Sequence, residues 1–412
     1  MTNRVPVVLT LVAAALGLFF ASFSTYDFVQ HLDRQVHGIH CSFVPGLSTT
    51  EVGGTGCHVT LMSPYSSVLR DVVWGGIPVS LPAMAVFAFL LFKGADVLLR
   101  RREDDPSYTG FLALAWTLPV LTSLGFGYLS LVQLDAACKM CIGIYAASAL
   151  GFLGALAARG LKLPGGSNSW RDLADEPGPE MEEDEPFRQP HAHVPMFGLG
   201  VGFVAAAVGL YLLAAPDYSS YVGSCGELTS TSDPNNVLLP LESNPGGAEA
   251  IEILDPLCPS CAGFETRLSA SGLGAGLDRK ALLFPLDDRC NWMVSGAVHP
   301  GACTISEAML CADDPAAVLD WAFEHQESIR EASAADPKAA RAMVEGAFPG
   351  VKGCVGTGRT RARLNKSLRW AVKNELPVLT PQLYVNGVKL CDEDTDLGMD
   401  YALSRLLEQV GS

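Results

Sequence analysis

Two C-x-x-C pairs are the residues best suited to chemistry in this chain: Cys138 with Cys141, and Cys258 with Cys261. Thiols three residues apart on a helix lie on one face with Cβ atoms roughly 5 to 6 Å apart, so a modest adjustment brings them to disulfide geometry. Such a pair exchanges electrons with another dithiol through a mixed disulfide. Zinc is an alternative for the second pair, but no other C-x-x-C or histidine pair lies at zinc spacing. We therefore predict redox-active cysteines and no metal.

The first pair lies where a polar turn enters a long apolar run. The residues after Cys141 are apolar through Ala158, which predicts that the pair lies at a membrane surface. A disulfide in this position can exchange electrons with one partner in water and with another in lipid.

The second pair follows a predicted buried strand, Ala250 to Leu254, and a helix is expected to begin near Pro259. Cys258 then lies at the helix N-terminus, where unpaired backbone amides and the helix dipole favour the thiolate. We expect Cys258 to be the exposed nucleophile and Cys261 to be the resolving thiol.

The composition predicts a membrane protein with more than one domain. Of 412 residues 49% are hydrophobic, and the mean hydropathy is +0.25, too apolar for a purely soluble protein. The first apolar run is long enough to be a retained helix rather than a cleaved signal peptide. Five runs are long enough to cross a lipid bilayer: Val5 to Tyr26, Trp74 to Phe92, Tyr108 to Leu134, Cys138 to Ala158 and Val194 to Ala215.

Basic residues in short loops predict the orientation. The run Arg100 to Arg102 lies between the second and third spans, and Arg159 and Lys162 follow the fourth. Both segments are assigned to the cytoplasm by the excess of basic residues there. The N-terminus is then cytoplasmic and the C-terminal part is exported, which predicts a multi-pass protein of the inner (cytoplasmic) membrane.

About half of the net charge of −16 comes from one segment, since residues 172–185 carry eight acidic residues and no basic residue. This segment is also rich in proline and glycine, as is typical of a solvated linker. Nothing in the charge pattern supports a nucleic-acid partner.

The loop from His31 to Val73 carries Cys41 and Cys57, with a Gly, Ser and Thr-rich stretch between them. This composition favours mobility and would let the two cysteines move between partners. A static Cys41 to Cys57 disulfide is one alternative. A metal site with the neighbouring His37, His40 and His58 is another, but the spacing matches no common zinc pattern.

Residues 5–158 resemble the vitamin K epoxide reductase family. The resemblance depends on the loop cysteine pair, the Ser63-Pro64-Tyr65-Ser66 element, Gly75-Gly76-Ile77-Pro78 before the second span, and a C-x-x-C followed by Tyr145. It implies a four-helix bundle around a quinone of the ubiquinone or menaquinone type.

The same resemblance implies a role for each cysteine. Cys141 would face the quinone, Cys138 would receive the attack of Cys57, and Cys41 would meet the partner outside the membrane. Ser63 and Tyr145 would line the quinone pocket.

From Ala248 to the C-terminus the chain resembles the DsbA-like members of the thioredoxin superfamily. The resemblance implies that Pro381 is cis, faces the C-x-x-C and binds the extended backbone of a partner, with Thr380 beside it. Asn386-Gly387 independently predicts a hairpin turn. The alanine-rich residues 305–374 fit the helical insertion of these proteins, and residues 396–410 fit the closing helix.

Six further cysteines follow the fifth span, and three structural disulfides are expected for an exported domain. Six cysteines allow fifteen pairings, and the sequence does not choose among them. They are Cys225, Cys290, Cys303, Cys311, Cys354 and Cys391.

The predicted fold class is therefore a membrane helical bundle of four core helices and a fifth tethering span, followed by a soluble α/β thioredoxin-like domain with a helical insertion. The predicted divisions are a membrane domain at 1–160, an acidic cytoplasmic linker at 161–193, the fifth span at 194–215, a loosely ordered exported spacer at 216–247, and the thioredoxin-like domain at 248–412.

These features lead to the hypothesis of a membrane oxidoreductase that forms disulfides in exported proteins with reduced cysteines and passes the electrons to the membrane quinone pool. One alternative is a quinone or vitamin K reductase that uses the thioredoxin-like part as its reductant. Another is a non-catalytic membrane-anchored binding or chaperone module with structural disulfides.

Overall fold

The computed structural model describes residues 4–33, 39–41, 56–160 and 194–410. The acidic linker predicted at 161–193, His37 and most of the mobile stretch predicted between Cys41 and Cys57 lie outside these residues. The described residues divide into two compact units. The first is built mainly from long apolar helices up to Ala215, and the second mainly from the chain after Pro216.

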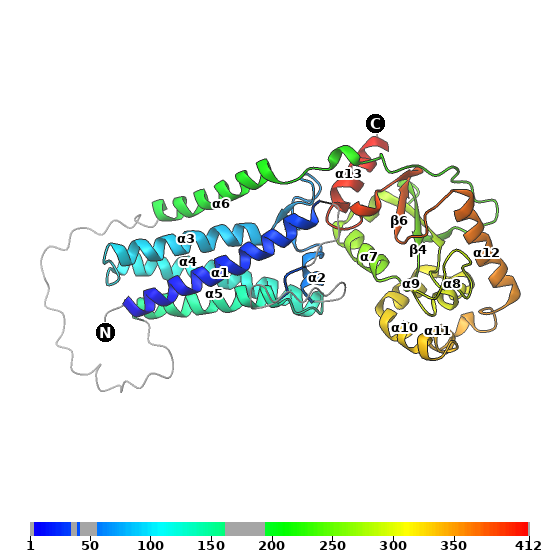
Figure 1. The fold of residues 1–412 in the computed structure, drawn as a ribbon, viewed down its shortest axis with the longest axis horizontal. Coiled ribbons are helices and arrows are strands. Elements are labelled where there is room, and N and C mark those ends of the chain that lie inside the picture. The colour runs from blue at the N-terminus through cyan, green and yellow to red at the C-terminus, as the bar shows by residue number, and fades with distance from the viewer. Residues whose placement is uncertain (1–3, 34–38, 42–55, 161–193, 411–412) are drawn as a thin grey trace, which may run out of the picture. The chain divides into compact units, whose positions relative to one another are not determined.

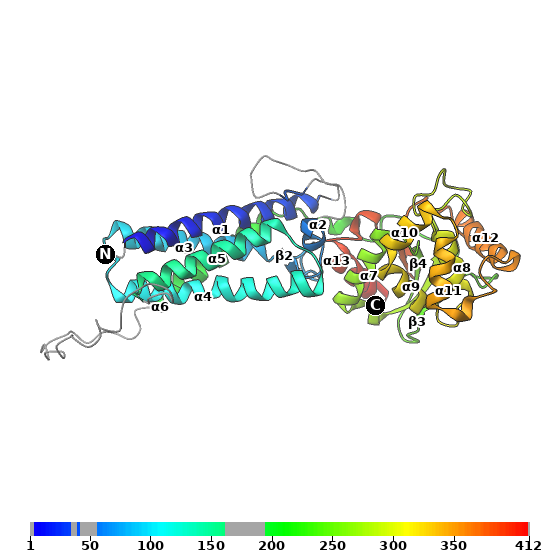
Figure 2. The same cartoon turned by 90° about the horizontal axis from the view of Figure 1, so that it is seen from below.

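In the first unit, four helices lie alongside one another in a bundle, and α6 packs on α3 (Figures 1 and 2). Each helix of this set is long and apolar enough to cross a membrane. The chain is therefore a membrane protein. The helices are α1 (Arg4–His31), α3 (Ser80–Leu99), α4 (Pro106–Tyr128), which continues as the π-helical η1 (Leu129–Gln133), α5 (Lys139–Ala158) and α6 (Val194–Ala214).

The second span begins and ends later in the chain than its hydrophobicity predicts. Trp74 to Phe92 was the expected range, whereas α3 covers Ser80–Leu99. Gly75 and Gly76 have φ values of 66° and 78°, a left-handed conformation that no helix continues through. Ile77–Pro78 (β2) then pairs with Ser67–Val68 (β1) in a short antiparallel ribbon. This ribbon and α2 (Gly56–Leu61) form the end of the bundle that carries the cysteines.

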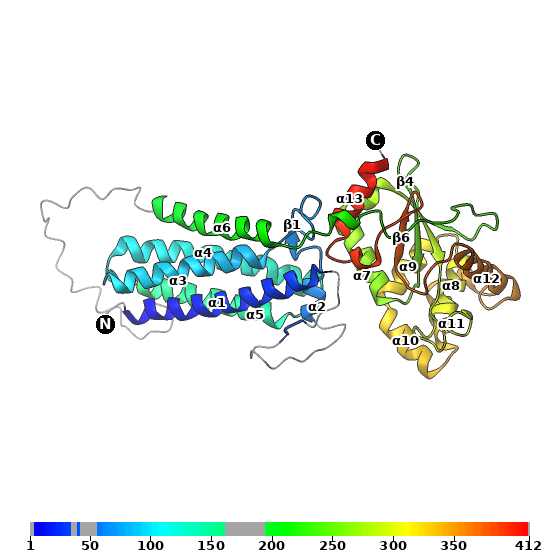
Figure 3. The same ribbon diagram turned by 45° about the horizontal axis from the view of Figure 1, so that its top comes forward.

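The second unit contains a five-stranded sheet in the order β3-β5-β4-β6-β7 (Figure 3). β4 and β5 are parallel neighbours joined through a helix, and the other neighbouring pairs are antiparallel. The buried residues of β4 and β5 are almost all aliphatic, as expected for central strands covered on both faces. The strands are β3 (Leu239–Glu242), β4 (Ala248–Leu254), β5 (Leu277–Leu283), β6 (Gln382–Val385) and β7 (Val388–Lys389).

The helices of the second unit follow the predicted plan. α7 connects β4 to β5, five helices are inserted between β5 and β6, and a last helix follows β7. Together with the sheet order, this gives a thioredoxin-like fold with a helical insertion. The helices are α7 (Pro259–Ser271), η4 (Leu273–Gly276), α8 (Ala302–Cys311), α9 (Pro315–Glu324), α10 (Gln326–Ala335), α11 (Ala339–Ala347), η5 (Pro349–Val351), α12 (Gly358–Lys373), η6 (Asp392–Asp394) and α13 (Met399–Val410).

The segment 216–247 is ordered, and the expectation of a loose spacer is wrong here. After η3 (Ser219–Tyr221), the chain enters the sheet as edge strand β3, which pairs with β5. Val237 is fully buried, and the carbonyl of Ser232 accepts a hydrogen bond from Trp370 Nε1 at 2.9 Å. The abundance of Ser, Asn, Pro and Gly predicted a loose spacer, but a strand of only four residues is enough to complete a sheet edge and leaves little pattern in such a sequence.

The six additional cysteines form three disulfides: Cys225–Cys391, Cys290–Cys303 and Cys311–Cys354. The structure thus selects one of the fifteen possible pairings. The first of these disulfides joins the segment before the sheet to the end of β7, and the other two close loops around α8. All three are typical of a domain that folds in an oxidising compartment.

Candidate active site

The membrane dithiol is built on the first turn of α5. Cys138 is the N-cap residue, and its Sγ accepts a hydrogen bond from the backbone amide of Cys141 at 3.2 Å. The Cys141 thiol donates to Cys138 Sγ at 2.6 Å. Cys138 is buried and Cys141 is partly exposed. The two sulfurs are therefore close enough to form a disulfide after little movement.

The loop cysteines lie beside this dithiol. Cys41 and Cys57 form a disulfide with a Cα to Cα distance of 5.8 Å. Both belong to one buried cluster with Cys138 and Met140, and Cys141 packs against it. The structure thus brings together all four cysteines that the sequence assigned to the membrane part.

A close backbone contact holds α2, which carries Cys57, against the segment before Cys138. A Cβ atom at Gly56 would lie 2.3 Å from the backbone oxygen of Ala137. No side chain fits in that space, so glycine is needed for the approach. The sequence shows Gly56 as one more glycine in a glycine-rich stretch, and its role is visible only in three dimensions.

A cavity of about 480 Å³ opens beside Cys141 within the helical bundle. Most of its wall is apolar, and the wall also includes Cys57, Cys138 and Cys141 and several serine and threonine residues. Both predicted pocket residues, Ser63 and Tyr145, line it. Other residues on the wall are Cys57, Thr60, Ser80, Val86, Phe87, Leu118, Phe126, Cys138 and Ile144.

An acid and a histidine that the sequence analysis did not single out together also border this cavity. Asp27 of α1 is only 2% exposed. It accepts a hydrogen bond from the His40 backbone amide at 2.9 Å and lies 2.5 Å from His40 Nδ1. These contacts fix the chain directly before Cys41, so they help to place the loop disulfide.

The soluble dithiol repeats the geometry of the membrane dithiol. α7 begins at Pro259, as predicted, and Cys258 is its N-cap residue. The prediction that Cys258 is exposed is wrong, because only 4% of it is accessible, although Cys261 is fully buried. Cys258 is covered by the segment before β6, where its Sγ lies 3.6 Å from the Thr380 carbonyl oxygen.

The two thiols of this pair are chemically unequal. A hydrogen bond from the Cys261 thiol lowers the pKa of Cys258 to about 6. Burial, together with the adjacent Cys258 sulfur, raises the pKa of Cys261. Thr380-Pro381 is a cis peptide bond facing this pair, so the structure places both predicted partner-binding residues at Cys258. A nucleophile and a resolving thiol are thus distinguished by their surroundings.

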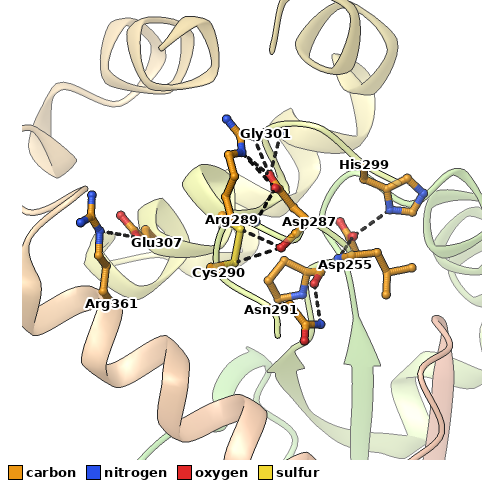
Figure 4. The surroundings of a disulfide bond; sticks show 12 residues. Asp255, Asp287, Arg289, Cys290, Asn291, His299, Gly301, Glu307 and Arg361 are labelled. Atoms are coloured by element: carbon orange, nitrogen blue, oxygen red, sulfur yellow. Dashed lines mark hydrogen bonds and ion pairs between the residues drawn. A yellow bond between two sulfur atoms is a disulfide. The ribbon is translucent and has the colours of Figure 1, made fainter. Parts of the chain in front are cut away.

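Two pairs of charged groups near this site were missed from the sequence. Glu252 of β4 is fully buried, and burial raises its pKa to about 7, while Arg279 contacts it at 3.0 Å. Asp255, at the end of β4, is also fully buried and lies 2.7 Å from His299 Nδ1 (Figure 4). Glu252 and Asp255 lie six and three residues before Cys258, so the sequence could have indicated the two acids. Their basic partners come from distant segments and could not be found in this way.

The helical membrane unit, the thioredoxin-like fold and the paired thiols define a membrane disulfide oxidoreductase. Residues 8–156 match the model of the Vitamin K epoxide reductase family. This part of the chain is therefore a vitamin K epoxide reductase family domain, and it is joined in one chain to the thioredoxin-like domain.

Among solved structures, the crystal structure of reduced DsbA1 from Neisseria meningitidis is similar at 16% sequence identity and a TM-score of 0.26. The similarity covers 44% of this chain and 97% of that chain. No curated protein matches the chain.

Proposed function

We propose that this protein forms disulfides in exported proteins and delivers the electrons to a membrane quinone. The observation that carries the proposal is the buried cluster in which the Cys41–Cys57 disulfide adjoins Cys138 and Cys141, next to an apolar cavity. A purely structural set of cysteines would not need a second, unpaired dithiol beside a disulfide. In the described structure Cys138, Cys141, Cys258 and Cys261 are free.

The first step takes place at Cys258. A client thiolate attacks the Cys258–Cys261 disulfide, and a mixed disulfide forms while Cys261 leaves with a proton. The second client thiol then resolves it, so that the client is oxidised and the Cys258 pair is reduced by two electrons. The depressed pKa of Cys258 favours this direction, because a stable thiolate is a good leaving group.

The client-binding surface in this proposal is the chain before β6. Thr380 and Pro381 would bind the client's extended backbone next to the sulfur. The preceding Val378 and Leu379 are 48% and 41% exposed. Exposed apolar side chains at a reactive thiol suit an incompletely folded client, which still exposes its own apolar residues.

The loop and membrane pairs carry the next two exchanges. The Cys258 thiolate attacks Cys41, which breaks the Cys41–Cys57 disulfide and leaves Cys57 as the thiolate. Cys261 then attacks Cys258 in this mixed disulfide, which re-forms the Cys258–Cys261 disulfide and releases Cys41 as the thiolate. Cys57 next attacks Cys138 of the Cys138–Cys141 disulfide, and Cys141 becomes the leaving thiolate. Cys41 finally attacks Cys57, which re-forms the Cys41–Cys57 disulfide and releases Cys138. Each exchange moves two electrons and regenerates the disulfide that was spent before it. The hydrogen bond between Cys141 and Cys138 supports a pair that opens and closes in place.

The cavity beside Cys141 fits a quinone ring in size and chemistry. A volume of about 480 Å³ lies within the range of small-molecule pockets, and the wall is mainly apolar. Ser63 and Tyr145 would hold the ring oxygens through their hydroxyl groups. When bound, a quinone supplies an acceptor for two electrons and two protons from the Cys138 and Cys141 dithiol.

The cellular arrangement follows from the same account. The basic segments at Arg100 to Arg102 and after Arg159 place the N-terminus in the cytoplasm of a cell with an inner membrane. The thioredoxin-like domain is then exported, where its clients fold and where its three structural disulfides persist. The membrane quinone pool and the lipid bilayer are the other partners.

Quinone reduction by the full chain tests this function. A reduced, unfolded dithiol protein should drive quinone reduction, and Cys141→Ser should slow it on the order of 100-fold or more, because the last dithiol can no longer form a disulfide. The control is the double variant Cys311→Ala with Cys354→Ala, which removes a structural disulfide and should retain the reaction once folding is verified. Unchanged quinone reduction in Cys141→Ser would refute the proposal.

A further inference from the structure

The buried Asp255 just before the C-x-x-C motif also contacts a histidine from outside the motif. The Cys258 backbone amide donates to the Asp255 carbonyl at 3.1 Å. The Asp255 carboxylate itself accepts from the Leu257 amide at 2.7 Å and contacts His299 Nδ1 at 2.7 Å. Asp255 is fully buried and His299 is only 7% exposed. One carboxylate therefore connects the turn that carries the nucleophile to an imidazole from another part of the chain.

The loop that carries His299 is fixed by a disulfide and by a second buried acid. Cys290–Cys303 closes it. The buried Asp287 lies just before the loop, and Arg289 and the Gly301 amide are directed at its carboxylate (Figure 4). The His299 backbone amide also donates to the Leu286 carbonyl at 3.0 Å. These contacts determine where the imidazole lies, so its position next to Asp255 is built into the fold.

The charges around Cys258 indicate what the Asp255 and His299 pair does. The hydrogen bond from Cys261 is the main cause of the lowered pKa of Cys258. The Asp255 carboxylate disfavours a thiolate at Cys258 and so opposes this lowering. Burial opposes an imidazolium at His299, but the hydrogen bond to Asp255 and the Cys258 sulfur outweigh burial and raise the pKa of His299. Arg330 of α10 is the opposing cation, and Cys261 and Thr380 are the other groups facing the thiol. A protonated His299 therefore compensates the acid that the fold places beneath the nucleophile.

We propose that His299, held by Asp255 and by the loop that Cys290–Cys303 closes, is a positioning residue that stabilises the Cys258 thiolate and so sets the oxidising strength of the dithiol. When a client dithiol reduces the disulfide, two electrons enter the pair, Cys258 remains as thiolate beside the imidazolium, and Cys261 takes one proton while the other goes to water. This inference deepens the proposed function and depends on it for the direction of transfer.

The test is a titration of Cys258 in the full chain. Reduced protein in detergent is alkylated across a pH series, and the Cys258 peptide is quantified by mass spectrometry; equilibrium with glutathione is read from the same peptide. His299→Gln should raise the apparent pKa of Cys258 by about one unit and make the disulfide about tenfold harder to reduce, equivalent to about 30 mV. His325→Gln is the matched control, because that histidine is exposed and its ring contacts Trp321, by a hydrogen bond to the carbonyl and by stacking.

Charge compensation predicts a second result that a merely structural role of His299 does not predict. Adding Asp255→Asn to His299→Gln removes the uncompensated carboxylate and should return both readouts to within about threefold of the parent. The double variant Cys290→Ala with Cys303→Ala should shift them in the same direction as His299→Gln. An unchanged Cys258 profile in His299→Gln, or an equal shift in His325→Gln, would overturn the inference. The titration needs neither client nor quinone, so its failure is distinct from a failure of the proposed function, which the parent's quinone reduction decides.

Discussion

At the scale of residues, the two free dithiols share one local design. Cys138 and Cys258 are both N-cap residues with extended backbone, and their partners lie in the first turn of α5 and α7. In the soluble pair, the hydrogen bond from Cys261 lowers the pKa of Cys258. These surroundings favour Cys258 as the nucleophile and Cys261 as the resolving thiol.

The pH dependence of Cys258 alkylation should follow its lowered pKa. The reduced form gains its thiolate stabilisation above a pH of about 6 and loses it as the pH falls through that value, because the thiolate becomes protonated. The alkylation rate of the Cys258 peptide in the full chain should therefore be half-maximal near pH 6, compared with about 8.5 for an ordinary cysteine. Cys261 should remain unreactive. A half-maximum above pH 8 would contradict the assignment of nucleophile and resolving thiol.

The positions of the two free dithiols at helix starts could be predicted from the sequence, because spacing and flanking hydrophobicity alone define a C-x-x-C at a helix start. The burial of Cys258 could not, because the covering group, Thr380, comes from more than a hundred residues later in the chain. His299 was out of reach for the same reason. A single histidine in a loop has no recognisable partner in the sequence, and its contact with Asp255 is seen only in the folded chain.

At the scale of elements, electron transfer within the membrane unit depends on the short helix α2 in the proposed relay. It holds Cys57 in the cluster with Cys138, and its approach to Ala137 leaves no room for a side chain at Gly56. Thr60, one turn further along α2, donates to the Gly56 and Cys57 carbonyls and so braces the same turn. Thiol exchange needs the attacking sulfur in line with the disulfide, so small displacements matter.

Gly56→Ala should impair the exchange between Cys57 and Cys138 without removing a thiol. The added methyl group collides with the Ala137 backbone and displaces α2, and quinone reduction driven by a client should fall at least tenfold. Gly110→Ala on α4 is the control, since a Cβ atom there meets nothing within 4 Å. Equal activity of the two variants would show that the close contact at Gly56 is dispensable.

Hydrophobic length predicted all five spanning helices, and the strand before the C-x-x-C and the Asn386-Gly387 hairpin were predicted from alternation and turn chemistry. The boundaries of α3 were displaced, because Gly75 and Gly76 end the preceding turn although the surrounding residues are apolar. β3 was missed because an edge strand of four residues, with a proline, has no clear period. Short elements are selected by the partner strand rather than by their own sequence.

At the scale of the whole molecule, the proposed relay has its donor and its acceptor of thiol exchange in one chain. A covalent connection through α6 makes their encounter intramolecular, which raises their effective concentration without any new contact. Neither part then needs a large docking surface for the other. This arrangement accounts for the presence of a redox-active thioredoxin-like domain in the same chain as a vitamin K epoxide reductase family domain.

In the proposed relay, electrons pass from Cys258 to Cys41 through a mixed disulfide, which can be trapped. In a full chain with Cys57→Ser and Cys261→Ser, neither resolving thiol remains, so mild oxidation should yield a peptide pair joined through Cys41 and Cys258, detected by mass spectrometry without reduction. A chain with Cys57→Ser and Cys258→Ser should yield no such link, because Cys261 is fully buried. We expect the Cys41 to Cys258 disulfide to be the dominant product. Its absence, in a preparation whose parent still passes electrons from client to quinone, would refute the relay.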